Sequence, residues 1–223
     1  MRDLLDLIIN KLKWPVAVYM TMSVPALLMS IDYFRFSSSK FLFFGGGIIF
    51  FVFSKMMSDS SLRSSMQTIA HEFTHAFFAL LTFHKVKSIH LDKDKGGDMV
   101  FEGEGNWLIV IGPYFFPLFC FGFMMVIPLW TMFFPSNIFI NLFLGYFMGY
   151  HIDTVVSQIH DKQTDLPKVS YTFCVMFLPG ANLFMLGSIL AFNSLGWKGI
   201  STYISLINHL NGKNFSELWH LLF

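Results

Sequence analysis

The stretch GNWLIVIGPYFFPLFCFGFMMVIPLWTMFFPSNIFINLFLGYFMGYHI, residues 105–152, contains no Asp, Glu, Lys or Arg in 48 consecutive positions. A second uncharged stretch of 29 residues runs from Val169 to Trp197. A water-soluble fold presents polar faces to solvent every few residues, whereas a helix that crosses a bilayer needs about 20 mainly apolar residues. These two stretches therefore predict a protein with several membrane-spanning helices.

The composition of the 223 residues agrees with this interpretation. Hydrophobic residues make up 54% and charged residues 13%, against about 25% charged residues in soluble domains. Such values exclude a soluble, disordered or disulfide-stabilised protein, and Cys120 and Cys174 are expected to pack as small hydrophobic residues. A net charge of +1 offers no basic surface, so no nucleic-acid partner is expected.

Six stretches are predicted to span the membrane. They are Trp14–Phe34, Phe41–Met57, Ser64–His84, Trp107–Phe134, Ile138–Ile159 and Lys168–Phe192. The second is short and contains Gly45-Gly46-Gly47, so we expect it to be tilted, kinked or re-entrant. Because the N-terminal residues lack the small-residue cleavage site of a signal peptide, the first span is expected to be retained. Positive charge is shared almost evenly between the two sides, which leaves the orientation open.

The most polar stretch, Lys85–Gly105, lies between the third and fourth predicted spans. Two β-prone runs on either side of Gly96-Gly97 predict a short β-hairpin there. After Trp197 the apolar residues recur at roughly helical spacing, which predicts a helix along the membrane interface. We therefore expect an all-α polytopic membrane protein with about six transmembrane helices and one β-hairpin.

Residues 71–75 read His-Glu-Phe-Thr-His and lie in the third predicted span. On a helix, His71 and His75 lie one turn apart on the same face, where two neutral imidazoles can bind one metal ion. Zinc accepts such ligands and keeps a coordination position open in catalytic sites, and Glu72 beside it is a candidate base for water. Because ionisable residues inside a span are costly and usually functional, the motif predicts a catalytic zinc site rather than a buried polar cluster.

A zinc motif on a membrane helix, followed by a β-hairpin and by Gly112-Pro113 at the start of the next span, resembles the site-2 protease family of intramembrane zinc metalloproteases. The resemblance covers roughly residues 60–192. It implies a three-span core that holds zinc below the membrane surface, with His71 and His75 as ligands and Glu72 as the catalytic acid/base. The family's third ligand is an Asp, usually in an Asp-Gly pair two spans after the zinc helix.

The third ligand departs from the family's pattern, since no Asp-Gly pair occurs in this chain. His151, Asp153 and Asp165 are the candidates two spans later. His151 and Asp153 point to opposite sides of their helix, so only one of them is expected to face the metal. We expect His151, which lies in the longest uncharged stretch, and place Asp165 second because it requires residues 163–167 to fold back toward the core. Asp153, the chemical match to the family's ligand, follows closely.

The resulting hypothesis is an intramembrane zinc metalloprotease of the cell membrane, with Zn²⁺ as its cofactor. Its partners are membrane-anchored protein substrates, cleaved as in regulated intramembrane proteolysis, and the lipid bilayer. The hairpin offers an edge to which an extended substrate could add as a strand. The protease core is expected at 59–193, between an N-terminal transmembrane hairpin (1–58) and an interfacial tail (194–223). Two alternatives stay open: a non-proteolytic binding or chaperone-like relative of the same fold, and a transporter with a His/Asp relay.

Overall fold

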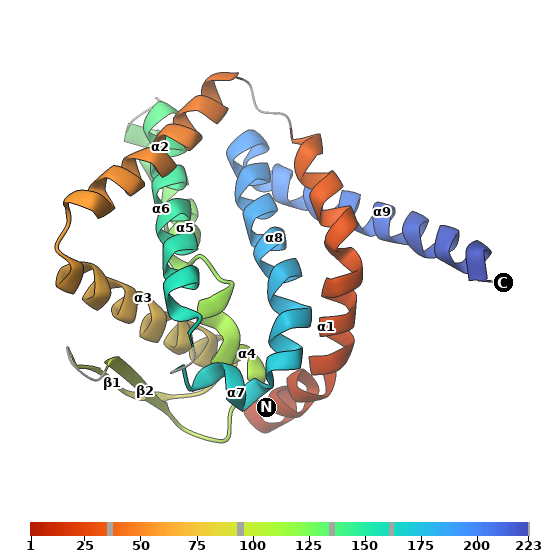
Figure 1. Ribbon diagram of the computed structural model, residues 1–223, viewed down its shortest axis with the longest axis horizontal. Helices are drawn as coiled ribbons and strands as arrows, with labels where there is room; N and C mark the ends of the chain where they lie inside the picture. Colours follow the sequence, from red (N-terminus) through yellow and green to blue (C-terminus); the bar gives the residue numbers. More distant parts are fainter. Residues whose placement is uncertain (35–37, 93–95, 134–136, 161–162, 223) are drawn as a thin grey trace.

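A computed structural model describes residues 1–34, 38–92, 96–133, 137–160 and 163–222 (Figure 1). Within these residues, α-helices dominate and one two-stranded sheet is present, so the predicted all-α class with a single hairpin is confirmed. The elements are α1 Arg2–Tyr33, α2 Ser38–Met57, α3 Ser60–Leu81, β1 Val86–Asp92, β2 Gly96–Phe101, α4 Trp107–Ile111, the 3-10 helix η1 Gly112–Tyr114, α5 Leu118–Phe133, α6 Asn137–Gln158, α7 Asp165–Val169, α8 Tyr171–Leu195 and α9 Trp197–Leu222.

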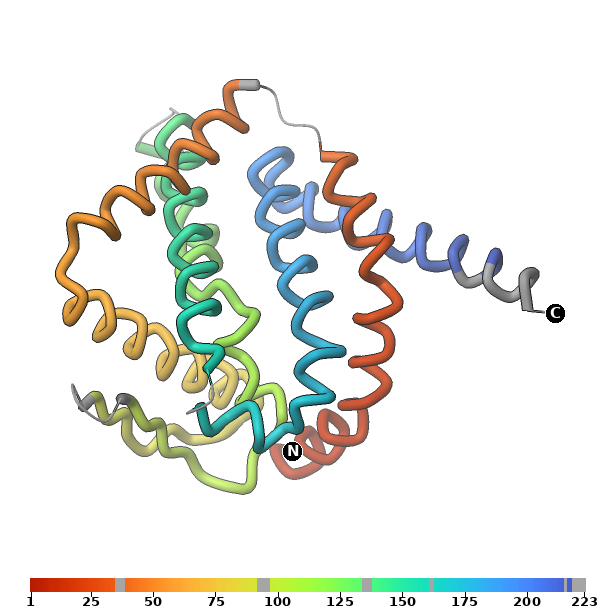
Figure 2. The backbone as a smooth tube through the Cα atoms, viewed as in Figure 1, coloured from red at the N-terminus to blue at the C-terminus, as the bar shows by residue number. Residues whose placement is uncertain are grey.

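Two pairs of long helices form the body of the molecule: α1 packs along α8, and α2 packs along α6 (Figure 1). The second pair is in close contact because Gly47 and Gly145 have no side chain. A methyl group on Gly47 would overlap the carbonyl of Leu142, and one on Gly145 would overlap that of Phe44. Gly47 of the glycine run therefore permits a close helix contact, whereas Gly45 and Gly46 have open space around them, and the second predicted span is a continuous helix. α9 packs against α8 and α1 and then runs away from the body (Figure 2).

Three of the described helices, α1, α2 and α8, are long and apolar enough to cross a membrane. The bent pair formed by α4–η1 and α5 makes a fourth if it is counted as one span. These helices agree with the predicted polytopic class but are fewer than the six predicted spans. The third and fifth predicted spans correspond to α3 and α6. Both are helices, but they carry polar side chains such as Gln67, His71 and Asp153, and neither is among the described helices that are apolar enough to cross a membrane.

The fourth predicted span, Trp107–Phe134, is not one continuous helix. Its two halves are bent by 84°, because Pro113 and Pro117 have no amide hydrogen to donate and restrict the residue before them. The last predicted span is likewise divided, into α7 and α8, at Ser170, whose φ of 78° lies outside the helical region. The short helix α4 contacts both α3 and α7, so the two breaks bring distant parts of the chain together beside α3.

The β-hairpin lies where it was predicted, between α3 and α4. Its strands are antiparallel, with His90 opposite Asp98 and Leu91 opposite Gly97. Gly96 and Gly97, which were predicted to form the turn, are instead the first residues of β2 and pair with Asp92 and Leu91. Residues 93–95, which connect the strands, are outside the described part of the chain. Both strands contact α3, and β2 makes the larger contact. The hairpin therefore covers part of the helix that carries the His-Glu-Phe-Thr-His motif (Figure 1).

An aromatic cluster fixes α4 and α8 relative to α3. Phe173 and Phe177 of α8 stack with ring centroids 5.3 Å apart, and both rings make edge-to-face contacts with Trp107 of α4. Phe78 of α3 and Tyr114 of η1 are buried in the same cluster. Aromatic pairs of this kind contribute about 0.5–1.5 kcal/mol beyond the burial of their area, so the cluster holds the supporting helices of the site rigidly in place.

Candidate metal centre

The motif lies on the second half of α3, as predicted. Asp59 caps the start of the helix: its carboxylate accepts a hydrogen bond from the backbone amide of Ser61 at 2.8 Å. His71 and His75 follow one turn apart, with ring centroids 4.7 Å apart and exposed fractions of only 6% and 8%. Two imidazole rings are thus buried on one face of the helix, where both can bind the same metal ion.

Asp165, the first residue of α7, completes this face from a distant part of the sequence. Its Oδ2 lies 3.2 Å from Nε2 of His71 and 3.3 Å from Nε2 of His75. Residues 163–167 therefore do fold back toward the core, because α7 packs against α4. One ligand atom from each of the three residues lies within 4.8 Å of the others, and among the described residues only this group could hold a metal ion.

The donor set of the three residues fits zinc. Two imidazole nitrogens and one carboxylate oxygen are ligands that zinc accepts, and three protein ligands leave one position open for a catalytic reaction. Nδ1 of His75 lies 2.7 Å from the carbonyl oxygen of Ile109, which can only accept a hydrogen bond. Nδ1 therefore carries the proton, and the lone pair of Nε2 is directed toward the other two ligand atoms.

The carboxyl group of Asp165 is held in its ionised form. Burial raises the pKa of Asp165, but hydrogen bonds from His71 and His75 and their positive charge when they are protonated outweigh burial, so that the pKa lies below its ordinary value. The second oxygen, Oδ1, lies 3.1 Å from the ammonium of Lys168 on the next turn. An ionised carboxylate between two imidazoles is the form that binds a cation.

Glu72 lies beside this group and is 5% exposed. The backbone of β2 packs directly against it, because a methyl group on Gly97 would overlap the Glu72 side chain. Glu72, His71, His75 and Asp165 line one cleft with a volume of about 630 Å³, together with polar residues that include Gln67, Ser157 and Gln163. The cleft is large enough to admit water and a segment of another chain to the metal-binding face.

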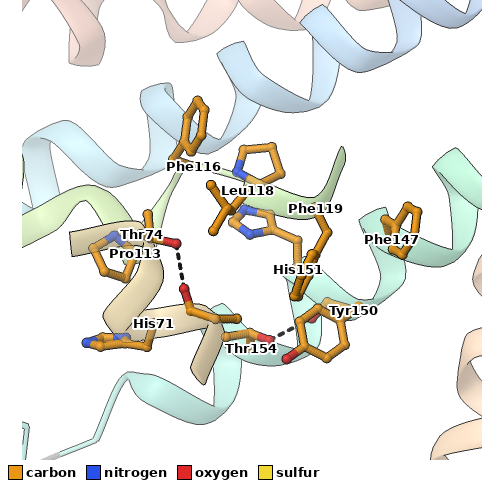
Figure 3. Close-up of a pocket in the computed structure, with 12 residues that line it drawn as sticks. His71, Thr74, Pro113, Phe116, Leu118, Phe119, Phe147, Tyr150, His151 and Thr154 are labelled. Atoms are coloured by element: carbon orange, nitrogen blue, oxygen red, sulfur yellow. Dashed lines mark hydrogen bonds between the residues drawn. The ribbon is translucent and has the colours of Figure 1, made fainter. Parts of the chain in front are cut away.

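His151, the expected third ligand, does not lie with His71 and His75. It is buried on α6 next to Asn182 and the backbone of Phe115, and its Nε2 has no hydrogen-bond partner among the described residues. The ring faces a separate cavity of about 20 Å³, roughly the space of one water molecule. Figure 3 shows His151 facing this cavity opposite Thr74, while the ring of His71 points out of it.

Asp153, the remaining candidate, links three helices. Its carboxylate bonds to the ammonium of Lys55 on α2 and accepts a hydrogen bond from Nε2 of Gln67 on α3 at 2.9 Å. Asp153 points to the opposite side of α6 from His151, as predicted, and neither residue joins the two histidines of the motif. The expected ligand order of His151, Asp165 and Asp153 thus differs from the arrangement of the side chains, which brings Asp165 alone to His71 and His75.

Two residues beside the metal-binding face were not identified from the sequence, Tyr114 and Lys168. Both contact Asp165, Tyr114 through its hydroxyl at 3.3 Å and Lys168 through its ammonium. Tyr114 directly follows the Gly112-Pro113 pair that was noted in the sequence, so the pair marked the correct segment. Lys168 follows Asp165 by three residues, a spacing that places both on one face of a helix.

Comparison with known proteins agrees with this geometry. Residues 47–151 match a family model described as Peptidase M50B-like, in agreement with the resemblance to the site-2 protease family that the motif indicates. The matched region contains α3, the hairpin and the bent α4–α5 segment, and it ends before Asp165. No curated protein and no solved structure matches the chain.

Proposed function

We propose that this protein is an intramembrane zinc metalloprotease that hydrolyses peptide bonds of membrane-anchored proteins. One observation carries the proposal. The Nε2 atoms of His71 and His75 and Oδ2 of Asp165 converge beside the buried carboxyl of Glu72, in a polar cleft of an otherwise apolar helical protein. The Peptidase M50B-like match supports the class of reaction.

In this proposal His71, His75 and Asp165 hold the zinc ion. Asp165 takes the place that we had expected for His151, since its carboxylate lies within hydrogen-bond distance of both motif histidines. It also supplies the kind of ligand that the resemblance implies. When bound, zinc polarises the scissile carbonyl and lowers the pKa of water, so that hydrolysis can proceed at neutral pH.

Glu72 has the position of the general base and acid. It lies next to the ligand His71 in the sequence and lines the same cleft as the three ligands. Its carboxylate would take the proton from the attacking water and then donate it to the amine of the leaving peptide. Its contact with the backbone of Gly97 holds the side chain at the side of the cleft that the hairpin covers.

We propose that the protein lies in the cell membrane and that its substrates are proteins anchored in the same membrane. A peptide bond within a helix is inaccessible while its amide groups are bonded internally, so the substrate must be extended where it is cleaved. The cleft lies against β2, whose backbone can support an extended segment by adding it as a further strand.

The test is co-expression of the protein with a library of membrane-anchored proteins. Wild type is expected to cleave at least one of them, and Glu72→Gln is expected to lower the rate about 10²–10⁴-fold while zinc content is unchanged, because general acid/base catalysis contributes this much. Glu102→Gln, the same change on a more exposed glutamate of the hairpin end, serves as the control. Retention of activity in Glu72→Gln within a few-fold would contradict the mechanism.

The same experiment separates the alternatives. A non-proteolytic binding or chaperone-like relative would contain zinc and leave every substrate intact. A transporter with a His/Asp relay would have no need of a stoichiometric zinc ion, so a wild-type protein without zinc would favour that alternative.

A further inference from the structure

The phenol of Tyr114 contacts Asp165 from the side of η1. Its hydroxyl donates to Oδ2 of Asp165 at 3.3 Å, the same oxygen that faces both histidines. Its ring stands perpendicular to that of His71, with centroids 5.3 Å apart. Tyr114 therefore contacts two of the three residues that we propose as zinc ligands.

Contacts with α8 and α3 fix the backbone around Tyr114 in place. The residue is fully buried, and its carbonyl oxygen accepts a hydrogen bond of 3.0 Å from the amide nitrogen of Asn182 on α8. The start of η1 is pressed against α3, since a methyl group on Gly112 would overlap the ring of Phe78, one turn after His75. The position of the hydroxyl is thus set by α3, η1 and α8 together.

The two oxygens of Asp165 are held with different strength. Oδ1 meets the ammonium of Lys168, whose side chain is 60% exposed, so this pair is screened by solvent and constrains the carboxylate weakly. Oδ2 meets the hydroxyl of Tyr114, a fully buried residue whose hydroxyl would be costly to leave without a partner. The rotation of the carboxyl group is therefore controlled mainly from the Tyr114 side.

From these contacts we infer that Tyr114 is a positioning residue, which keeps Oδ2 of Asp165 directed at the metal ion. The inference rests on the proposed zinc site. The hydroxyl can still donate to Oδ2 when that oxygen binds a metal, because a carboxylate oxygen has a lone pair for each partner. Hydrogen-bond partners of this kind, one step removed from the metal, typically contribute 10–100-fold to metal affinity.

The test compares the zinc affinity of purified full-length variants by competition with a chromophoric chelator. Tyr114→Phe removes the hydroxyl alone and is expected to weaken zinc binding about 10–100-fold. Tyr203→Phe is a matched control: Tyr203 is also fully buried, and its hydroxyl donates at the same distance of 3.3 Å to the carbonyl of Leu183, away from the metal-binding face. This control is expected to bind zinc within about threefold of wild type.

Cobalt substitution gives a second readout that a general loss of stability would not change. Because d–d absorption of Co²⁺ depends on ligand geometry, Tyr114→Phe is expected to shift the spectrum and Tyr203→Phe to leave it unchanged. Equal zinc affinity and an unaltered spectrum in Tyr114→Phe would overturn the inference, as would an equal loss in both tyrosine variants. If wild type binds no zinc, or Asp165→Asn binds it normally, the proposed zinc site itself is wrong.

Discussion

The described part of the chain contains two buried histidine–carboxylate clusters, and one of them has the features expected of a metal site. In the first, His71, His75 and Asp165 converge on one point and line an open cleft. In the second, Nε2 of His84 lies 3.0 Å from Oδ2 of Asp6. The remaining atoms of this second pair meet protein groups, since Nδ1 of His84 lies 3.0 Å from the Thr82 hydroxyl and the other Asp6 oxygen accepts a 2.6 Å hydrogen bond from Asn106.

The difference lies in how many ligand atoms converge and in what they face. The second cluster joins three segments: Asp6 lies near the start of α1, His84 in the loop after α3, and Asn106 directly before α4. It therefore ties the N-terminal helix to the rest of the protein. The first cluster gathers a second histidine instead of a hydroxyl and an amide, and its ligand atoms border a volume open to water. Burial of a histidine beside a carboxylate is therefore not enough to propose a metal site. What distinguishes the first cluster is that further candidate ligand atoms converge beside an open volume.

The largest effect on zinc content is expected from a substitution that disrupts the first cluster. Asp165→Ala should remove the third ligand and lower zinc content well below the roughly one ion per chain expected for wild type, with loss of all cleavage. His151→Ala should leave zinc content unchanged, because His151 faces a separate cavity. Metal analysis of the two purified variants decides between them, and a full site in Asp165→Ala with an empty one in His151→Ala would restore our original expectation.

This contrast also shows what local sequence can predict. The motif, its helix and the hairpin follow from the spacing of nearby residues, so they could be identified in advance. The position of Asp165 depends on α7 turning back at Ser170 to pack on α4, a contact between segments more than 50 residues apart. Length and apolarity predicted a continuous helix over Trp107–Phe134, whereas Pro113 and Pro117 in that segment were the signal for its break.

A smaller effect is expected where the hairpin touches the first cluster. Gly97→Ala places a methyl group where the Glu72 side chain lies, so the strand or the carboxylate must move. We expect cleavage to fall about 10–100-fold, since a misplacement of about 1 Å can cost as much, while zinc content is unchanged because neither residue is a proposed ligand. Gly46→Ala, at a helical glycine with open space around it, is the control. A normal cleavage rate in Gly97→Ala would show that Glu72 tolerates displacement.

The smallest effect on zinc binding is expected from a substitution in the second cluster. Asp6→Asn keeps the shape of the side chain but removes the charge that faces His84, so the variant should lose about 1–3 kcal/mol of stability. Its midpoint of thermal unfolding in detergent should therefore fall. Added zinc should still raise the midpoint by as much as in wild type, because the stabilisation depends only on zinc concentration and affinity. Asp165→Ala should behave in the opposite way, with no rise on addition of zinc. If zinc also failed to stabilise Asp6→Asn, the two clusters would be coupled, and the N-terminal helix would belong to the metal site after all.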